Sequence, residues 1–428
     1  MNKINAILGT MSINNVIFAI IMFGTFFMAT VWSIQAPFFP KEAERKGLSP
    51  TQYSLVFAIY ELTTILVTPL VGMYMSYMGA RFLAIAGLFV SAVTVILFGI
   101  LVYVKSSSDF FILSAVVRIV EAIGMSSYCI SLVVLISTLY PTSVAFRQSL
   151  NEMCFGGGMI FGPSIGGFLY VWGGYLMPFM SVGLTLLAVV IVSILFLPET
   201  EHDYQPSSSP ISLTLSCLKI FRVWVNLFSI LSCSITIGFI SATLEPQLRQ
   251  LNLSSEIVGL IFTLHPVMYV WIAPLFGYWI DRGLDKRLCI IIGASAKVLA
   301  FSLIGPLPWT DLVFSLHLVS IGLVINGFSN GAIINAILQE LLTITAEYIP
   351  ETKEVSHGIA SGLFQTTFAL GTFIGPLFGG YVLKTVGFQW GAFAIVVLNI
   401  IVVLTVAHMV IQQKIKRPAV LETKALLG

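Results

Sequence analysis

The chain has little charge: Asp, Glu, Lys and Arg make up 9% of its 428 residues, against about 25% in an ordinary soluble domain. Its 21 Lys and Arg nearly balance its 19 Asp and Glu, which excludes a nucleic-acid-binding protein. The five cysteines are odd in number and nearly all lie in or beside apolar runs, which argues against a disulfide framework. With 57% hydrophobic residues, the composition indicates a polytopic membrane protein.

The apolar residues fall into long runs. A helix needs about 20 such residues to cross a bilayer, and the sequence predicts twelve spans on that basis. Lys3 alone is no charged leader and no small-residue cleavage site follows, so we expect the first span to be retained. The predicted spans are 15–38, 51–76, 82–104, 110–138, 149–170, 175–197, 221–246, 256–279, 287–305, 312–338, 357–383 and 388–411.

A polar, turn-rich stretch separates the first six spans from the last six. The predicted domains are an N-terminal six-helix half at 15–197, a cytoplasmic linker at 198–219, a C-terminal half at 220–411 and a cytoplasmic tail at 412–428. The halves repeat short motifs: Pro69-Leu-Val-Gly72 matches Pro274-Leu-Phe-Gly277. Two related six-helix halves are typical of rocking transporters.

Lys and Arg predict the orientation, because cytoplasmic loops are enriched in them. With the N-terminus inside, thirteen of them fall on the cytoplasmic side and six on the other. We therefore expect both termini and the linker to face the cytosol, in a vesicular or plasma membrane.

Loops after the second and eighth spans share a pattern of glycine, three residues, a polar residue and then basic residues. This resembles the loop motif of the major facilitator superfamily. In the superfamily motif the polar residue is an acid that contacts a helix end. The first copy has Ser76 at that position, so we expect only the second copy, with an acid, to make this contact. The residues assigned to this motif are Gly72, Gly79, Arg81, Gly277, Asp281 and Arg282.

A glycine and proline pattern in the fifth span recurs in the eleventh, 213 residues later. It resembles the antiporter-type motif of the same superfamily. Glycines four residues apart let helices pack closely, and a proline bends the helix. The residues are Gly158, Gly162, Pro163, Gly167, Gly371, Gly375, Pro376 and Gly380.

The chain also resembles the vesicular amine transporter family, most closely its polyamine-carrying branch, over nearly its whole length. The similarity rests on the runs Ala36–Glu44, Leu244-Glu245-Pro246, Gly327–Gly331 with Glu340, and Ser361–Phe364. It implies an all-α membrane protein of twelve transmembrane helices in two pseudo-symmetric halves, working by proton–cation antiport. The first span lacks the acid of the monoamine carriers and the loop at 39–50 is short, which favours a polyamine.

Ionisable groups inside spans are costly and are functional hypotheses by default. Glu61 is the candidate cation- or proton-binding carboxylate, with a neutral, hydrogen-bonded acid as the alternative. Arg118 and Glu121 share a helix face, so a coupling pair and a structural ion pair remain equally open. Glu245, near the luminal end of its span, is a candidate amine ligand or a residue in headgroup water.

Three further polar residues lie inside the C-terminal spans. His265 is more often a packing residue than a ligand, but joins the candidates. Asn330 is a candidate lining residue or interhelical glue. Lys297 is expected to snorkel or to form a structural pair, and Glu340 to lie at a hydrated helix end.

The sequence shows no catalytic cluster and no metal-ligand cluster, and its cytosolic segments are short. We therefore expect no enzyme and no cofactor, with a proton gradient as the energy source. The expected partners are a small cationic substrate and the lipid bilayer, with the carrier acting as a monomer. The alternative is a facilitator or symporter of a neutral or anionic small solute.

Overall fold

The structure is a computed structural model that describes residues 13–198, 209–252, 255–310, 313–349 and 353–427. These residues form helices and connecting turns, with no strand among them. The helices are α2 (Ile13–Arg45), α3 (Pro50–Met73), α4 (Met75–Met78), α5 (Ala80–Ile100), η1 (Leu101–Tyr103), α6 (Ser107–Leu139), α7 (Val144–Gly173), α8 (Leu176–Phe196), α9 (Pro210–Leu218), α10 (Phe221–Leu248), η2 (Arg249–Leu251), α11 (Ser255–Asp281), α12 (Lys286–Ile304), α13 (Leu316–Tyr348), α14 (Lys353–Thr385) and α15 (Phe388–Leu427).

In the described part of the chain, twelve of these helices are long and apolar enough to cross a membrane, which confirms the predicted count. They are α2, α3, α5 with η1, α6, α7, α8 and α10 to α15. Two helices occupy stretches that the sequence analysis gave to the linker and the tail: α9 lies within 198–219, and α15 continues to Leu427. Large apolar side chains within the spans remain exposed, for example Leu195 of α8 at 69%, as a lipid-facing surface requires.

The chain divides into two compact units. Among the described residues, unit 1 comprises 13–141, 150–198, 209–210 and 353–366, and unit 2 comprises 142–149, 211–252, 255–310, 313–349 and 367–427. The first residues of α7 therefore belong to unit 2, and the first residues of α14 belong to unit 1. Each unit keeps a short segment from the other half of the sequence.

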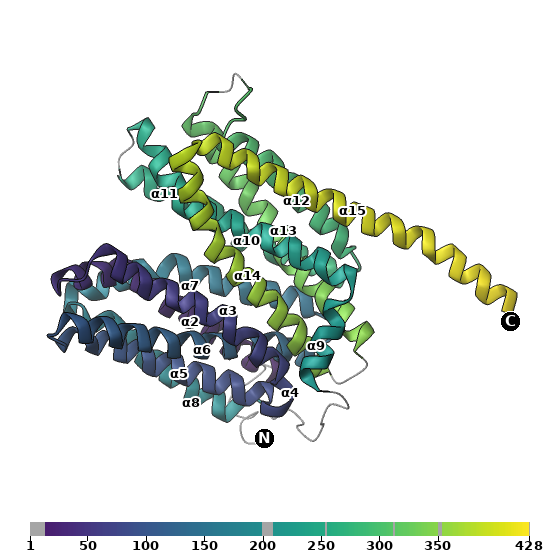
Figure 1. Cartoon of the computed structure of the whole chain (residues 1–428). Coiled ribbons are helices and arrows are strands. Elements are labelled where there is room, and N and C mark those ends of the chain that lie inside the picture. The colour runs from purple at the N-terminus through teal and green to yellow at the C-terminus, as the bar shows by residue number, and fades with distance from the viewer. Residues whose placement is uncertain (1–12, 199–208, 253–254, 311–312, 350–352, 428) are drawn as a thin grey trace. The chain divides into compact units, whose positions relative to one another are not determined.

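In unit 1, α5 packs between α6 and α8, and α3 packs on α6 (Figure 1). Four fully buried phenylalanines fill the core. The ring of Phe39 lies 5.0 Å from that of Phe98 and 5.9 Å from that of Phe110, and Phe98 lies 5.7 Å from Phe179. This aromatic core fixes α2 against α5, α6 and α8.

In unit 2, α12 packs on α13 and α15, while α11 packs on α13. Gly293 of α12 and Gly322 of α13 allow this closeness: a Cβ on Gly293 would come within 2.9 Å of the Ser329 carbonyl oxygen, and one on Gly322 within 2.8 Å of that of Ala300. Antiparallel contacts of this kind place the middle of α12 directly against the middle of α13.

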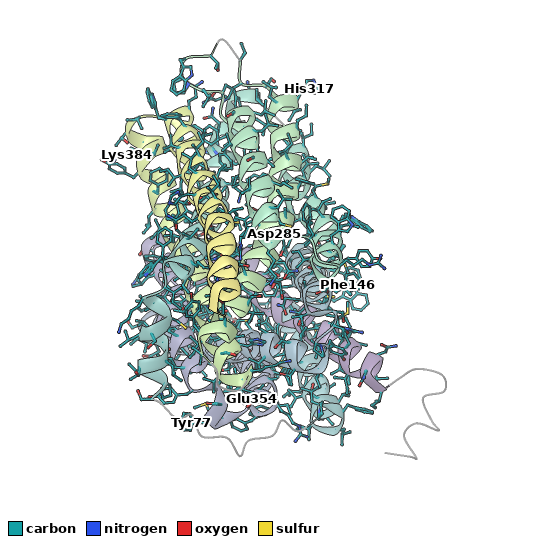
Figure 2. All side chains as sticks on the ribbon, turned by 90° about the vertical axis from the view of Figure 1, so that its right-hand side faces the viewer. Tyr77, Phe146, Asp285, His317, Glu354 and Lys384 are labelled. Carbon is teal, nitrogen blue, oxygen red and sulfur yellow. The ribbon has the colours of Figure 1, made fainter. Side chains whose placement is uncertain are left out.

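Unit 2 has two distinguishable ends. Figure 2 shows His317 and Lys384, near the start of α13 and the end of α14, at the end of the unit away from Asp285. Asp285 caps α12, its Oδ1 accepting from the Arg287 backbone N–H at 2.9 Å. The end of the unit that carries Asp285 also carries Lys286 and Arg287, and we call it the basic end.

Candidate functional site

Arg118 and Glu121 form a buried ion pair in unit 1. They lie three residues apart on α6, so their side chains share a face, and they are 2% and 1% exposed. Arg118 Nη1 lies 2.9 Å from Glu121 Oε1. Gln35 of α2 donates from Nε2 to both carboxylate oxygens, at 3.0 and 2.8 Å. The charge of Glu121 is therefore balanced by the guanidinium of Arg118, and both of its oxygens accept hydrogen bonds from the Gln35 amide.

Aromatic rings of α3 cover the other side of Arg118. Its guanidinium carbon lies 4.1 Å from the centre of the Tyr60 ring and 5.6 Å from that of Phe57, which is the geometry of a cation–π contact. Arg118 Nε has no hydrogen-bond partner among the described residues. Arg118 is thus held by a carboxylate on one side and by aromatic faces on the other.

Glu61 is the second carboxylate of this cluster. It follows Tyr60 on α3, is partly buried, and lies near the Trp32 side chain. Among the described residues no lysine or arginine lies within 4.0 Å of it, although Arg118 is near enough to act through space. Trp32 and Gln35 lie three residues apart on α2, so one helix face contacts both carboxylates.

The cluster has a negative balance. It holds the carboxylates of Glu61 and Glu121 against one guanidinium, that of Arg118. Gln35 Oε1 is buried and accepts no hydrogen bond among the described residues. Because a carboxylate and a carbonyl oxygen only accept hydrogen bonds, the vacant positions here suit a donor such as an ammonium group.

Unit 2 holds a buried lysine, Lys297. Of the two alternatives expected for it, snorkelling is wrong because the side chain is 0% exposed, whereas a structural contact is compatible with its hydrogen bonds. Its Nζ donates to Asn330 Oδ1 at 2.6 Å and to Cys233 Sγ at 3.2 Å. Asn330 Nδ2 lies 2.7 Å from His265 Nε2. In the described part of the chain, Lys297 has these neutral partners and no carboxylate within 4.0 Å.

The close packing of α12 on α13 explains this placement. Lys297 lies one turn after Gly293, on the face that contacts α13, so its side chain enters the unit and cannot reach the headgroup layer. Asn326 lies one turn before Asn330, is fully buried, and has no partner on either side-chain atom among the described residues. A lysine one turn after a small residue, opposite two asparagines, is the signal that could have identified this cluster.

Glu245 gives less information. Its backbone lies in α10, three residues before the end of that helix, and its side chain is outside the described residues. Its assignment as an amine ligand stays a prediction.

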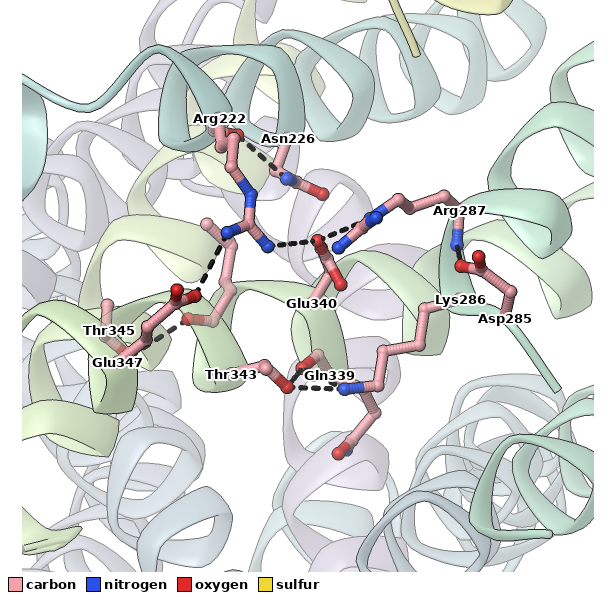
Figure 3. A network of polar contacts seen from close by, with 11 residues as sticks. Arg222, Asn226, Asp285, Lys286, Arg287, Gln339, Glu340, Thr343, Thr345 and Glu347 are labelled. Atoms are coloured by element: carbon pink, nitrogen blue, oxygen red, sulfur yellow. Dashed lines mark hydrogen bonds and ion pairs between the residues drawn. The ribbon is translucent and has the colours of Figure 1, made fainter. Parts of the chain in front are cut away.

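Glu340 was expected to be hydrated, but it is 3% exposed and paired. Arg222 Nη2 lies 3.0 Å and Arg287 Nε 2.9 Å from its Oε1, and both contacts can be followed in Figure 3. The second guanidinium nitrogen of Arg222 pairs with Glu347 at 3.0 Å. The expectation failed because the partners of Glu340 lie on α10 and α12, far from it in sequence. This network fastens three helices at the basic end of unit 2.

The second loop motif forms a helix cap. Asp281, at the end of α11, accepts hydrogen bonds from the backbone N–H groups of Ala145 and Phe146, at 3.0 and 2.7 Å. Both belong to the α7 segment of unit 2. A Cβ on Gly277 would lie 2.6 Å from the Ala145 carbonyl oxygen, so glycine permits the approach that brings Asp281 to the helix. Arg282 lies over the Tyr278 ring at 4.4 Å.

The first loop motif packs differently. A Cβ on Gly72 would lie 2.5 Å from the Gly358 carbonyl oxygen, so α3 and the start of α14 touch through glycines within unit 1. Gly79 has φ of 81°, a conformation that glycine adopts without strain. Arg81 Nη2 donates to the Ile194 carbonyl oxygen at 2.8 Å. Ser76 is buried at the position of the missing acid, and its hydroxyl has no partner among the described residues.

The two glycine and proline motifs act at matching places. Gly158 and Gly162 of α7 press against α2 at Phe26, Ala29 and Ser33, while Gly371 and Gly375 of α14 press against α10 at Leu231, Ser234 and Ile235. Pro163 and Pro376 lie inside α7 and α14. Among the described residues, an added Cβ on Gly167 or Gly380 would meet no atom within 4 Å, so packing accounts for the first two glycines of each motif and not for the last.

The described residues contain no group of three or more His, Cys, Asp or Glu placed to hold a metal ion. What the two clusters offer is charge and hydrogen bonding inside each unit: two acids with one arginine in unit 1, and a lysine with a histidine in unit 2. These groups suit the binding of a solute or a proton.

Comparisons with known proteins agree with this arrangement. A family model described as Major Facilitator Superfamily matches residues 21–244 and 226–425. The MFS-type transporter SLC18B1 of Rattus norvegicus is 33% identical over 363 residues, which cover 84% of this chain and 79% of the relative. The synaptic vesicular amine transporter of Homo sapiens is 23% identical over 344 residues, which cover 79% of this chain and 63% of that protein.

Solved structures show the same fold. The transporter FucP, in the outward conformation, aligns with a TM-score of 0.71 at 17% identity, over 93% of this chain and 99% of that one. The human organic anion transporter MFSD10 aligns with a TM-score of 0.68 at 16% identity, over 92% and 99%. Together with its twelve spans and its two repeated halves, these matches establish that the chain belongs to the Major Facilitator Superfamily, as a secondary transporter of the SLC18 type and not an enzyme.

Proposed function

We propose that the chain exchanges protons for an organic cation of the polyamine class, and that Glu61 binds the cation. The observation that carries this proposal is the cluster of unit 1, where Glu61 lies near an indole and has no described cation within 4.0 Å. Two relatives, the synaptic vesicular amine transporter of Homo sapiens and the chromaffin granule amine transporter of Rattus norvegicus, support an amine substrate. The polyamine class itself rests on the sequence motifs around Pro40, Glu245 and Gly327.

The chemistry of one carboxylate supports exchange. Glu61 can hold a proton or pair with an ammonium group, and each excludes the other. An inside-acid vesicle favours the protonated form on that side, so the amine is released there and the proton leaves on the opposite side. Trp32 is the aromatic side chain beside Glu61 and suits an ammonium ion through cation–π contact.

Arg118 and Glu121 have a supporting part in this proposal. Glu121 is fully engaged by Arg118 and Gln35, so it is not free to bind an amine. The guanidinium of Arg118 lies near Glu61 and repels a bound ammonium group, so it weakens the binding of the amine to Glu61. A bound amine therefore leaves readily once Glu61 takes up its proton.

The test is uptake of labelled spermidine by proteoliposomes, with and without an inside-acid gradient. We expect the gradient to drive accumulation, and Glu61→Gln to reduce it at least tenfold, because an amide cannot exchange a proton. The matched control is Glu347→Gln, the same change at a residue whose side chain is 57% exposed and lies in the other unit. Accumulation that ignores the gradient, or that survives Glu61→Gln, contradicts the proposal.

The buried Lys297 favours a second candidate, transport of a neutral or anionic solute. A lysine whose described partners are all neutral has capacity for an anion. In that case labelled spermidine does not accumulate. A labelled member of a panel of organic anions and neutral solutes is taken up instead, and Glu61→Gln leaves that uptake unchanged.

A further inference from the structure

Lys297 and His265 are two basic groups joined through one amide. Asn330 Oδ1 lies 2.6 Å from Lys297 Nζ, and Asn330 Nδ2 lies 2.7 Å from His265 Nε2. Lys297 and Asn330 are buried at 0% and 1% exposed, while His265 is partly exposed. The proton exchange proposed at Glu61 makes no use of these three residues.

Hydrogen-bond chemistry restricts which of the two bases is charged. A lysine ammonium only donates, so it requires the amide oxygen to face Lys297. The amide nitrogen then donates to His265 Nε2, which must be bare, and the imidazole is neutral. If His265 instead carries a proton on both nitrogens, the amide must turn over, and its nitrogen then donates to a neutral lysine amine. Both contacts keep their lengths in either arrangement.

The surroundings support a single charge. The described polar groups that contact Lys297 and His265 are Cys233 from α10 and Asn330 from α13, and the buried Asn326 lies one turn before Asn330. No carboxylate within 4.0 Å among the described residues balances a second positive charge, and like charges so near one another disfavour double protonation. The unpartnered amide of Asn326 gives the site capacity for a water molecule.

We propose that Lys297, Asn330 and His265 together bind one coupling proton of the transport cycle, separate from the proton at Glu61. Loading forms one N–H bond on the pair and breaks one O–H bond of a hydronium ion, and unloading reverses this. His265 is the point of exchange with water because it is the partly exposed member. This inference rests on the proton coupling of the proposed function and adds a second proton to it.

The test measures how steeply spermidine accumulation depends on the pH gradient, with the membrane potential held at zero. The slope of log accumulation ratio against the gradient then gives the protons exchanged per substrate. Three substitutions should stop the site from taking up and releasing its proton: Lys297→Arg, which stays protonated; Asn330→Asp, which pairs with the lysine and keeps it charged; and His265→Gln, which removes the exchange point. We expect each to lower the slope by one proton while spermidine exchange at equal pH continues.

The matched control is Ser329→Ala. Ser329 Oγ donates to the Gly293 carbonyl oxygen at 2.7 Å, across the same contact of α12 with α13, so this variant loses a buried polar contact there and should keep the full slope. Spermidine exchange at equal pH shows that each variant is folded. If Lys297→Arg shows no such exchange, the slopes of the two other variants test the inference. A slope unchanged in the folded variants overturns the inference alone. A wild-type slope of zero overturns the proposed proton coupling and this site with it.

Discussion

Glu121 and Asn330 occupy the same position in two helices of equal length. Each is the fifteenth residue of a 33-residue helix, α6 in unit 1 and α13 in unit 2. Glu121 accepts from Arg118, and Asn330 accepts from Lys297. The repeated halves therefore keep a buried cation bound at the equivalent point, with an acid in one half and a neutral amide in the other.

A second equivalence lies on the neighbouring helices. Tyr60 and His265 each stand nine residues before the first residue of the repeated Pro-Leu-x-Gly motif, at Pro69 and Pro274. Tyr60 covers the guanidinium of Arg118, and His265 binds the amide that holds the lysine. Where unit 1 has Glu121 and Tyr60 around a buried arginine, unit 2 therefore has Asn330 and His265 around a buried lysine.

Breaking the ion pair of unit 1 should destabilise the protein strongly. Glu121→Gln leaves Arg118 buried without its countercharge, which costs about 3–5 kcal/mol. Replacing both residues, Glu121→Leu with Arg118→Met, should recover most of that loss. Thermal unfolding of the detergent-purified variants measures the effect, and equal melting temperatures for wild type and Glu121→Gln would show that the pair has no structural weight.

The packing glycines of α7 should differ sharply in tolerance. A Cβ on Gly158 would lie 2.8 Å from the Cβ of Ala29, and overpacking of this kind costs about 1–3 kcal/mol. Gly158→Ala should therefore lower the melting temperature. The matched change Gly167→Ala, in the same helix but with open space around it, should leave it equal or higher. A lower melting temperature for Gly167→Ala would contradict the conclusion that Gly158 and Gly162, and not Gly167, are the packing glycines of the motif.

The cap made by Asp281 should protect the start of α7. Asp281→Ala removes two hydrogen bonds to the helix N-terminus, and a lost cap costs about 0.5–2 kcal/mol. Hydrogen–deuterium exchange of a peptide covering residues 144–149 should become faster. Asp285→Ala, which removes the cap of α12 instead, is the control and should leave the exchange rate of that peptide unchanged. An unchanged rate in Asp281→Ala would contradict the role of Asp281 as the cap of α7.

Cys217 should react slowly with alkylating reagents. Burial in α9 raises the pKa of its thiol to about 11, so the reactive thiolate is roughly a thousandth of the total at pH 8. Because the thiolate fraction rises with pH below the pKa, labelling by iodoacetamide should increase about tenfold per pH unit between pH 7 and 9. Mass spectrometry of the modified peptide gives the rate, and rapid labelling that does not vary with pH would contradict this environment.

The sequence predicted the number of spans and the repeat because both depend on local apolar runs and short motifs. It could also place Arg118 with Glu121, since three residues on one helix fix their proximity. It did not find the engagement of Glu121 by Gln35, 86 residues away, because Gln35 lies in a span whose other residues are mostly apolar. Contacts between helices depend on the rotation of each helix, which the pattern of one span does not determine.

The same limit explains the two misplaced charges. Lys297 was expected to snorkel because the ninth helix is usually peripheral in this superfamily, whereas the approach of α12 to α13 through Gly293 brings it inside. Glu340 looked hydrated because it lies toward the end of its span, whereas Arg222 and Arg287 cover it from 118 and 53 residues away. In both cases the deciding contacts join separate helices.

Because each compact unit contains a segment from the other half of the sequence, the two halves are not independent when they are made as separate polypeptides. Residues 142–149 belong with unit 2 and residues 353–366 with unit 1. A fragment ending in the linker would lack the α14 segment whose Gly358 meets Gly72, and the complementary fragment would lack the α7 start that Asp281 caps. Neither fragment contains the whole of one compact unit, so we expect a split gene to yield a working carrier only when both fragments are synthesised into the same membrane.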